Sequence, residues 1–237
     1  MSGVARMTSY TLLFPVCNEE KNLPRMFKML ESMNPKADHV IFMESGSTDN
    51  SLEMLALYAD THPNVDAYNC EKESKYTFYD IAFARQCLLN IARKLDADFT
   101  FYMDCDTEPK DLNFLEKLSN VLLVHNNFDM IGCSYRFKKY KKRLPRNDEP
   151  YVKLGNLPLY QTVVVPFGCV CISRRIIQNP QINFFPLFIN KHDGSIFNED
   201  ISYCILCIRL GYNLLLENTI KVIHHQDFSI KREWRLE

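Results

Sequence analysis

The acidic pair Asp104 and Asp106 directly follows the apolar run Phe99–Met103, which is typical of a buried strand. Hard divalent cations such as Mg²⁺ and Mn²⁺ prefer carboxylate oxygens, and one or two acidic side chains suffice where other oxygens complete the shell. The alternative is an ordinary strand-end turn whose aspartates are solvated. The pair therefore indicates either a cation site or a polar turn.

Position distinguishes this pair from another with the same spacing. Asp96 and Asp98 precede the predicted strand, whereas Asp104 and Asp106 come after it. In open α/β sheets, ligands bind outside the carboxyl ends of the strands, so only Asp104 and Asp106 are placed for binding. A cation held there could neutralise the charge that builds on a diphosphate leaving group.

Two histidines stand at the end of another predicted strand. His224 and His225 close the apolar run over 214–224. A neutral imidazole there could add a ligand to a cation already held by carboxylates, and the alternative is a structural or surface histidine.

Adjacent carboxylates begin a predicted helix. Glu199 and Asp200 follow Asn198 at its start. Acidic residues in a first turn are also expected from the helix dipole alone. The functional interpretation is a general base, which accepts a proton from a hydroxyl group.

Two polar turns follow the first two predicted strands. One is the segment PVCNEE from Pro15, and the other is ESGSTD from Glu44. Gly46 permits a turn that other residues make only at a cost, and Glu44 would point into the same cleft and accept a hydrogen bond from a base N–H. The alternatives are a helix cap at Asn18 and an ordinary capped turn.

Strand and helix patterns alternate through the first 135 residues. This alternation predicts an α/β fold with a mostly parallel central sheet and flanking helices. The length of 237 residues suits a single domain over 1–237. The predicted strands cover 8–16, 39–43, 66–70, 99–103, 128–135 and 214–224, with a strand pair over 163–173, and the predicted helices cover 19–33, 49–58, 78–95, 111–125 and 198–210.

Composition argues against several classes of protein. The formal net charge is −1, which gives no general attraction to nucleic acid or membranes. No apolar run reaches the roughly 18 residues of a membrane span, and the first residues lack the apolar stretch of a signal peptide. The spacings of Cys169 with Cys171 and Cys204 with Cys207 lack the turn residues of a zinc ribbon. We expect a cytoplasmic protein with free core thiols.

The stretch from Arg136 to Arg146 is strongly basic. Such a run is either a solvated face or a site that attracts an anionic acceptor or donor. The segment over 136–159 is also long and punctuated by prolines, so we expect it to be mobile without ligand.

Four segments resemble, in order and spacing, the inverting GT-A glycosyltransferases of glycosyltransferase family 2. They are PVCNEE, ESGSTDNS, YMDCDTE and NEDISYCILCIRLGY, and AFARQCLLNIA is similar to the family's helix before its D-x-D strand. The resemblance covers about 8–229 and implies a nucleotide-binding half over 8–106, an acceptor-side half over 107–229 and a tail over 230–237.

The resemblance implies transfer of a hexosyl or deoxyhexosyl group from a nucleotide diphosphate-sugar to a hydroxyl of a glycan or glycoconjugate. The reaction would be inverting and dependent on Mn²⁺ or Mg²⁺. The chain has no membrane helices and lacks the Q-x-x-R-W motif of processive members, which implies a non-processive enzyme.

Residue by residue, the resemblance also implies a site. Asp200 matches the catalytic base, beside Glu199, and Arg85 matches an arginine near the diphosphate. Asp104 would approach the ribose. The metal set is Asp106 and Asp104 with His224 or His225. The remaining positions of the nucleotide-sugar site are Pro15, Val16, Asn18, Glu19, Glu44, Gly46 and Cys105.

The choice of donor base stays open because Glu44 stands where the family usually has aspartate. A UDP- or dTDP-sugar is expected ahead of a GDP-sugar. A nucleotidylyltransferase or a dinucleotide-binding dehydrogenase would need a glycine-rich phosphate loop after the first strand, and the chain has none there. The remaining alternative is a catalytically silent sugar- or nucleotide-binding protein of the same fold.

Overall fold

The computed structural model describes residues 7–70, 77–137, 152–153, 159–162, 164–185, 187–189 and 196–225. Most of the basic stretch, most of the segment over 136–159 that is predicted to be mobile, and the tail over 230–237 lie outside these residues. One sheet of ten strands organises the described part of the chain, in the order β3-β2-β1-β4-β9-β6-β10-β8-β7, with β5 paired to β10.

The first half of the sheet is parallel. Strand β1 (Tyr10–Val16) lies between β2 (His39–Glu44) and β4 (Phe99–Met103), and β3 (Val65–Asn69) forms the outer edge. Helices connect these strands, as the alternating sequence pattern predicts. The carboxyl ends of all four strands therefore meet along one edge.

The second half is mixed, so the sheet as a whole is less parallel than the sequence predicts. Strand β9 (Cys169–Ser173) runs antiparallel to β4 and to β6 (Met130–Phe137). Strand β10 (Leu214–His224) is parallel to β6. The short strands are β5 (Thr107–Pro109), β7 (Val152–Lys153) and β8 (Leu159–Thr162), all in antiparallel pairs. Antiparallel neighbours need no crossover helix, and the alternating pattern accordingly ends in this half.

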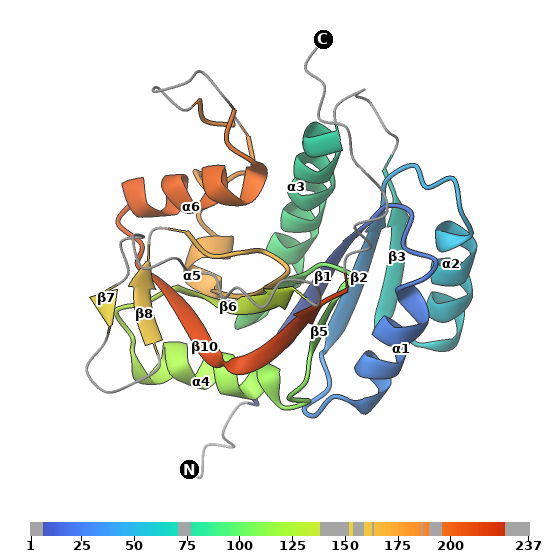
Figure 1. The fold of residues 1–237 in the computed structure, drawn as a ribbon, viewed down its shortest axis with the longest axis horizontal. Coiled ribbons are helices and arrows are strands. Elements are labelled where there is room, and N and C mark those ends of the chain that lie inside the picture. Colours follow the sequence, from blue (N-terminus) through green and yellow to red (C-terminus); the bar gives the residue numbers. More distant parts are fainter. Residues whose placement is uncertain are drawn as a thin grey trace.

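Helices cover both faces of the sheet (Figure 1). One core contains α1 (Leu23–Ser32), α2 (Ser51–Thr61) and α4 (Phe114–Val124), and the other contains α3 (Thr77–Leu95), α5 (Arg174–Ile177) and α6 (Glu199–Arg209). Successive strand residues point to opposite faces, so Leu12 and Phe14 enter the first core and Leu13 the second. Among the described helices, none combines the length and apolar character needed to cross a membrane.

Two predicted local structures are wrong in detail. Helix α1 begins at Leu23 rather than Glu19, with Asn22 at its N-cap and a proline in its first turn. Asn18 is not the cap because its φ is 57°, in the left-handed region that asparagine tolerates. In the described part of the predicted strand pair over 163–173, the one strand is β9, which starts at Cys169.

No disulfide joins any of the nine cysteines, all of which lie in the described residues, and most of them are buried. Cys169 and Cys171 face one core, while Cys204 and Cys207 face the other, so these two pairs lie on opposite sides of the sheet. The rejection of a zinc site that joins them is therefore consistent with the fold.

Candidate active site

The turns after β1 and β2 are joined by hydrogen bonds into one unit. The Asn18 N–H donates to Ser47 Oγ at 2.8 Å, and the Thr48 N–H donates to Asn18 Oδ1 at 2.7 Å. The Glu19 N–H donates to Ser51 Oγ at 2.8 Å. The sequence separation of these partners is about thirty residues, so the contacts fix the relative position of two strand ends.

Gly46 and Glu44 shape the second of these turns. Gly46 has a φ of 70°, as its predicted role requires. The Glu44 side chain is 1% exposed and accepts a hydrogen bond from the Ser47 N–H. The expectation that Glu44 points into an open cleft is therefore not met, because its carboxylate stabilises its own turn.

The residues before these turns differ in exposure. Val16 is buried, and its carbonyl accepts hydrogen bonds from Ser45 N–H and Oγ–H. Pro15, Asn18 and Glu19 are at least partly exposed. A ligand at this edge would therefore meet these three residues rather than the Val16 side chain.

The D-x-D turn follows β4 and is held by hydrogen bonds between its backbone and Gly168 and Thr107. The Asp104 N–H donates to Gly168 O at 3.3 Å, and the Thr107 hydroxyl donates to Asp104 O at 2.8 Å. Cys105 is 2% exposed and packs in the core beneath the turn. Because this side chain is buried in the core, the geometry gives no support to the predicted place of Cys105 in the nucleotide-sugar site.

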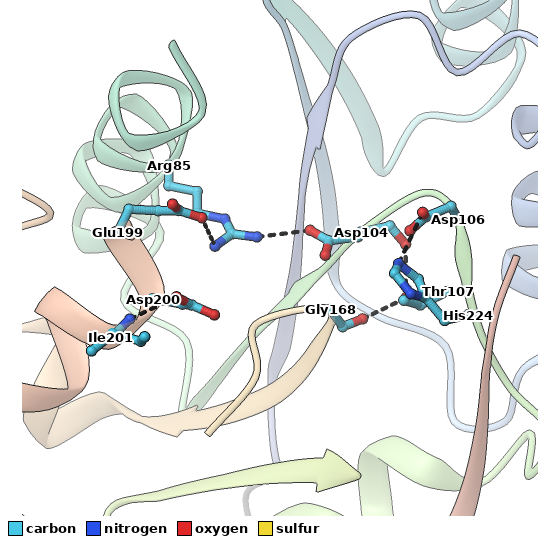
Figure 2. A network of polar contacts seen from close by, with 9 residues as sticks. All are labelled: Arg85, Asp104, Asp106, Thr107, Gly168, Glu199, Asp200, Ile201 and His224. Carbon is cyan, nitrogen blue, oxygen red and sulfur yellow. Dashed lines mark hydrogen bonds and ion pairs between the residues drawn. The ribbon is translucent and has the colours of Figure 1, made fainter. Parts of the chain in front are cut away.

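Arg85 connects this turn to the start of α6. Its Nη2 lies 2.8 Å from Asp104 Oδ1, and its Nη1 lies 2.6 Å from Glu199 Oε1 (Figure 2). The Arg85 side chain is 3% exposed. Both terminal nitrogens thus contact carboxylates, so this geometry gives no support to the expected contact with a diphosphate.

Asp200 lies beside this ion-pair network without a salt bridge among the described residues. Its Oδ1 accepts a hydrogen bond from the Ile201 N–H at 2.7 Å, and its carboxylate extends from α6 toward the side where Asp104 lies (Figure 2). Burial raises the pKa of Asp200, although Arg85 lowers it. The net direction is upward, because burial has a larger effect on Asp200 than Arg85 has.

The two histidines at the end of β10 have different partners. His224 Nε2 lies 2.9 Å from Asp106 Oδ2, whereas His225 Nε2 lies 2.8 Å from Glu108 Oε2. Antiparallel pairing places His224 opposite Thr107 and so beside the D-x-D turn. Burial by itself lowers the pKa of His224. The contact with Asp106 raises this pKa by more than burial lowers it, so the net shift is upward.

Asp106 and His224 offer a carboxylate oxygen and an imidazole nitrogen that lie 2.9 Å apart, and both atom types bind divalent cations. Within the described residues, no group of three or more His, Cys, Asp or Glu side chains is arranged to hold a metal ion. The pair would need oxygens from a ligand and from water, which is the usual arrangement where a cation binds phosphates.

Sequence reasoning missed three contributors to this site. They are Glu108, which pairs with His225, and Thr107 and Gly168, which hold the D-x-D turn. Glu108 was detectable as a third acidic residue two positions after Asp106. Gly168 had no local signal, because its role depends on the pairing of β9 with β4.

The sequence profile of Glycosyl transferase family 2 matches residues 11–179, which is more than half of the chain. The chain belongs to this family. The predicted GT-A type of α/β fold is confirmed by this match and by the solved structures that follow. No curated protein sequence matches the chain.

Solved structures share the fold of this family member. TarS of S. aureus aligns with a TM-score of 0.66 at 15% identity, over 92% of this chain and 37% of that one. TarS 1–349 in complex with UDP-GlcNAc has a TM-score of 0.64 at 16% identity, over 91% and 58%. The mannosyltransferase PcManGT of Pyrobaculum calidifontis, in complex with GDP-Man and Mn²⁺, has a TM-score of 0.60 at 13% identity, over 97% and 59%. This chain spans between 37% and 59% of the length of these three solved structures.

Proposed function

We propose that this family 2 member is a glycosyltransferase that moves a sugar from a nucleotide diphosphate-sugar to an acceptor hydroxyl. The observation that carries the proposal is the network in which Arg85 joins Asp104 to Glu199, next to Asp200. It brings the D-x-D turn and an acidic helix start together from distant parts of the chain. Family membership supports the same conclusion.

The donor would bind at the edge formed by the turns after β1 and β2. Pro15, Asn18 and Glu19 lie there with some exposure, next to the D-x-D turn. We favour a UDP- or dTDP-sugar that carries a hexose or deoxyhexose. Relatives of the fold were solved with UDP-GlcNAc and with GDP-Man, so the donor base is a point for experiment.

A divalent cation, Mn²⁺ or Mg²⁺, would be held by Asp106 and His224 and by oxygens of the donor. When bound, such an ion neutralises charge on the diphosphate leaving group. In the chain itself, the pairing of β5 with the end of β10 holds the Asp106 and His224 side chains next to each other. Glu108 holds His225 apart from this pair.

Asp200 would act as general base toward the acceptor, a glycan or glycoconjugate hydroxyl. Direct displacement with one base on the acceptor side inverts the anomeric configuration. The metal-assisted leaving group needs no general acid, so a single carboxylate is enough for this reaction. We infer non-processive transfer and a cytoplasmic setting, without a nucleic-acid partner. The alternative is a silent binding protein of the same fold.

A donor screen tests the proposal. The protein is incubated with UDP-, dTDP- and GDP-sugars and Mn²⁺ or Mg²⁺, with and without acceptors, and nucleoside diphosphate release is measured. We expect release that stops in excess chelator and in Asp106→Ala. The matched control is Asp96→Ala, from the D-x-D spacing at the opposite end of β4, which should keep activity.

Two results would contradict different parts of this proposal. Undiminished release in chelator would rule out the metal. Binding of a nucleotide sugar without release by the parent protein, under every condition, would favour the silent binding protein.

A further inference from the structure

Arg85 links two segments that are far apart in the sequence. It contacts Asp104, 19 residues later, and Glu199, 114 residues later. All three belong to elements that meet at the site: α3, the end of β4 and the start of α6. Figure 2 shows the guanidinium between the two carboxylates. One side chain therefore bridges the D-x-D turn and the Glu199-Asp200 turn.

Arg85 is itself held in place by its surroundings. The Tyr102 hydroxyl donates to Arg85 O at 3.0 Å, and the Arg85 Cζ lies 5.1 Å from the centre of the Phe167 ring. Phe167 precedes Gly168, whose carbonyl accepts the Asp104 N–H. The first contact holds the Arg85 backbone, and the second places the Phe167 ring against its guanidinium.

We propose that Arg85 is a positioning residue, which holds the Glu199-Asp200 turn against the D-x-D turn so that Asp200 faces the acceptor. This inference rests on the proposed function, in which Asp200 is the base. The planar fork of arginine can bind two carboxylates at once, whereas lysine presents a single point charge. The sequence resemblance instead suggests a donor contact for Arg85, so the two roles make different predictions.

The charges around Asp200 show what the loss of Arg85 would do. Arg85 approaches from α3 and Asp104 from the end of β4, while Glu199 and Cys204 lie on α6 itself. Arg85 lowers the pKa of Asp200, and Asp104 raises it. Without Arg85, the pKa of Asp200 should rise. A base acts only when ionised, so the acid limb of the rate profile should move to higher pH.

The kinetic experiment compares Arg85→Lys, Arg85→Gln and Glu199→Gln with the parent protein. Arg85→Lys keeps the charge but reaches one carboxylate, so kcat should fall about tenfold to a hundredfold while donor affinity is unchanged. Arg85→Gln should lose more and move the acid limb upward. Glu199→Gln keeps an oxygen that accepts from Arg85, so its kcat should change least. A loss of donor affinity in Arg85→Lys with unchanged kcat would show a donor contact and overturn the inference.

A second measurement does not depend on turnover. Protein with ¹³C-labelled aspartate carboxyl groups is titrated by NMR, and the Asp200 signal is assigned by its loss in Asp200→Asn. We expect a higher Asp200 pKa in Arg85→Gln and a smaller change in Arg85→Lys. An unchanged Asp200 pKa in a folded Arg85→Gln protein would overturn the inference. If the parent transfers no sugar, the proposed function fails, and this titration still decides the link between Arg85 and Asp200.

Discussion

Glu199 and Asp200 are adjacent carboxylates of α6 with different surroundings. Glu199 is buried and paired with Arg85 at 2.6 Å. Asp200 has no such partner among the described residues and accepts one backbone hydrogen bond. Burial raises the pKa of both side chains. The ion pair holds Glu199 in place, whereas the Asp200 carboxylate remains available to receive a proton. This difference assigns a supporting role to Glu199 and a reactive role to Asp200 in the proposed function.

Asp200→Asn should therefore reduce kcat by about 10² to 10⁴-fold, the usual effect of removing a positioned base. Donor affinity should stay near that of the parent, because Asp200 lies on the acceptor side of the proposed site. Steady-state rates and calorimetric donor titration measure the two effects, with Glu199→Gln as the matched neighbour. A product with retained anomeric configuration by NMR, or an Asp200→Asn rate within a few-fold of the parent, would remove Asp200 from this role.

At the scale of elements, the turns after β1 and β2 behave as one unit because Asn18 links them. Asn18→Gly keeps the backbone conformation but loses the acceptor for the Thr48 N–H, so it should weaken donor binding. Asn18→Ala loses the same acceptor but keeps the Cβ at a φ of 57°, which glycine removes. It should be less stable than Asn18→Gly by about 1 kcal/mol. Urea unfolding measures the stability of both variants, and nucleoside diphosphate titration measures their donor affinity. If both variants bind the donor as tightly as the parent protein does, the link between the two turns is not needed for donor binding.

Long apolar patterns predicted the elements well. Strand β4 over Phe99–Met103 and β10 over Leu214–His224 have the predicted bounds, and α6 begins and ends within one residue of them. Each carries a strong periodic pattern, which is the clearest signal available to sequence reasoning. Strand β5 was missed because Thr107–Pro109 has three residues, one a proline, and exists only by pairing with β10.

The candidate site was predictable in position but not in its contacts. The sequence placed Asp104, Asp106 and the two histidines at strand ends. It could not choose His224 over His225, because that choice depends on the register of β10 against β5. Nor could it predict the partners of Arg85, which come from two other elements. Such contacts arise from packing between distant segments, and local patterns do not encode them.

At the scale of the whole molecule, one sheet joins the proposed donor side to the proposed acceptor side. The antiparallel pairing of β4 with β9, and of β9 with β6, forms the junction. The division into halves at about 106 and 107 remains a prediction. Phe167 lies two residues before the start of β9, and its ring contacts Arg85. A displacement of the chain at this junction should therefore also move Arg85.

Gly132 of β6 provides the test. A Cβ added there would lie 2.7 Å from Val165 Cβ and 3.4 Å from Pro166 O, so the segment leading to Phe167 must move. Gly132→Ala should destabilise the fold by about 1–3 kcal/mol through overpacking and should also lower kcat.

The matched control is Gly211→Ala, where φ is +85° and nothing lies within 4 Å of the new Cβ. That substitution should cost about 1 kcal/mol of backbone strain and leave kcat unchanged. Urea unfolding and steady-state rates measure both variants. Equal kcat values in the two folded proteins would show that the junction does not position Arg85.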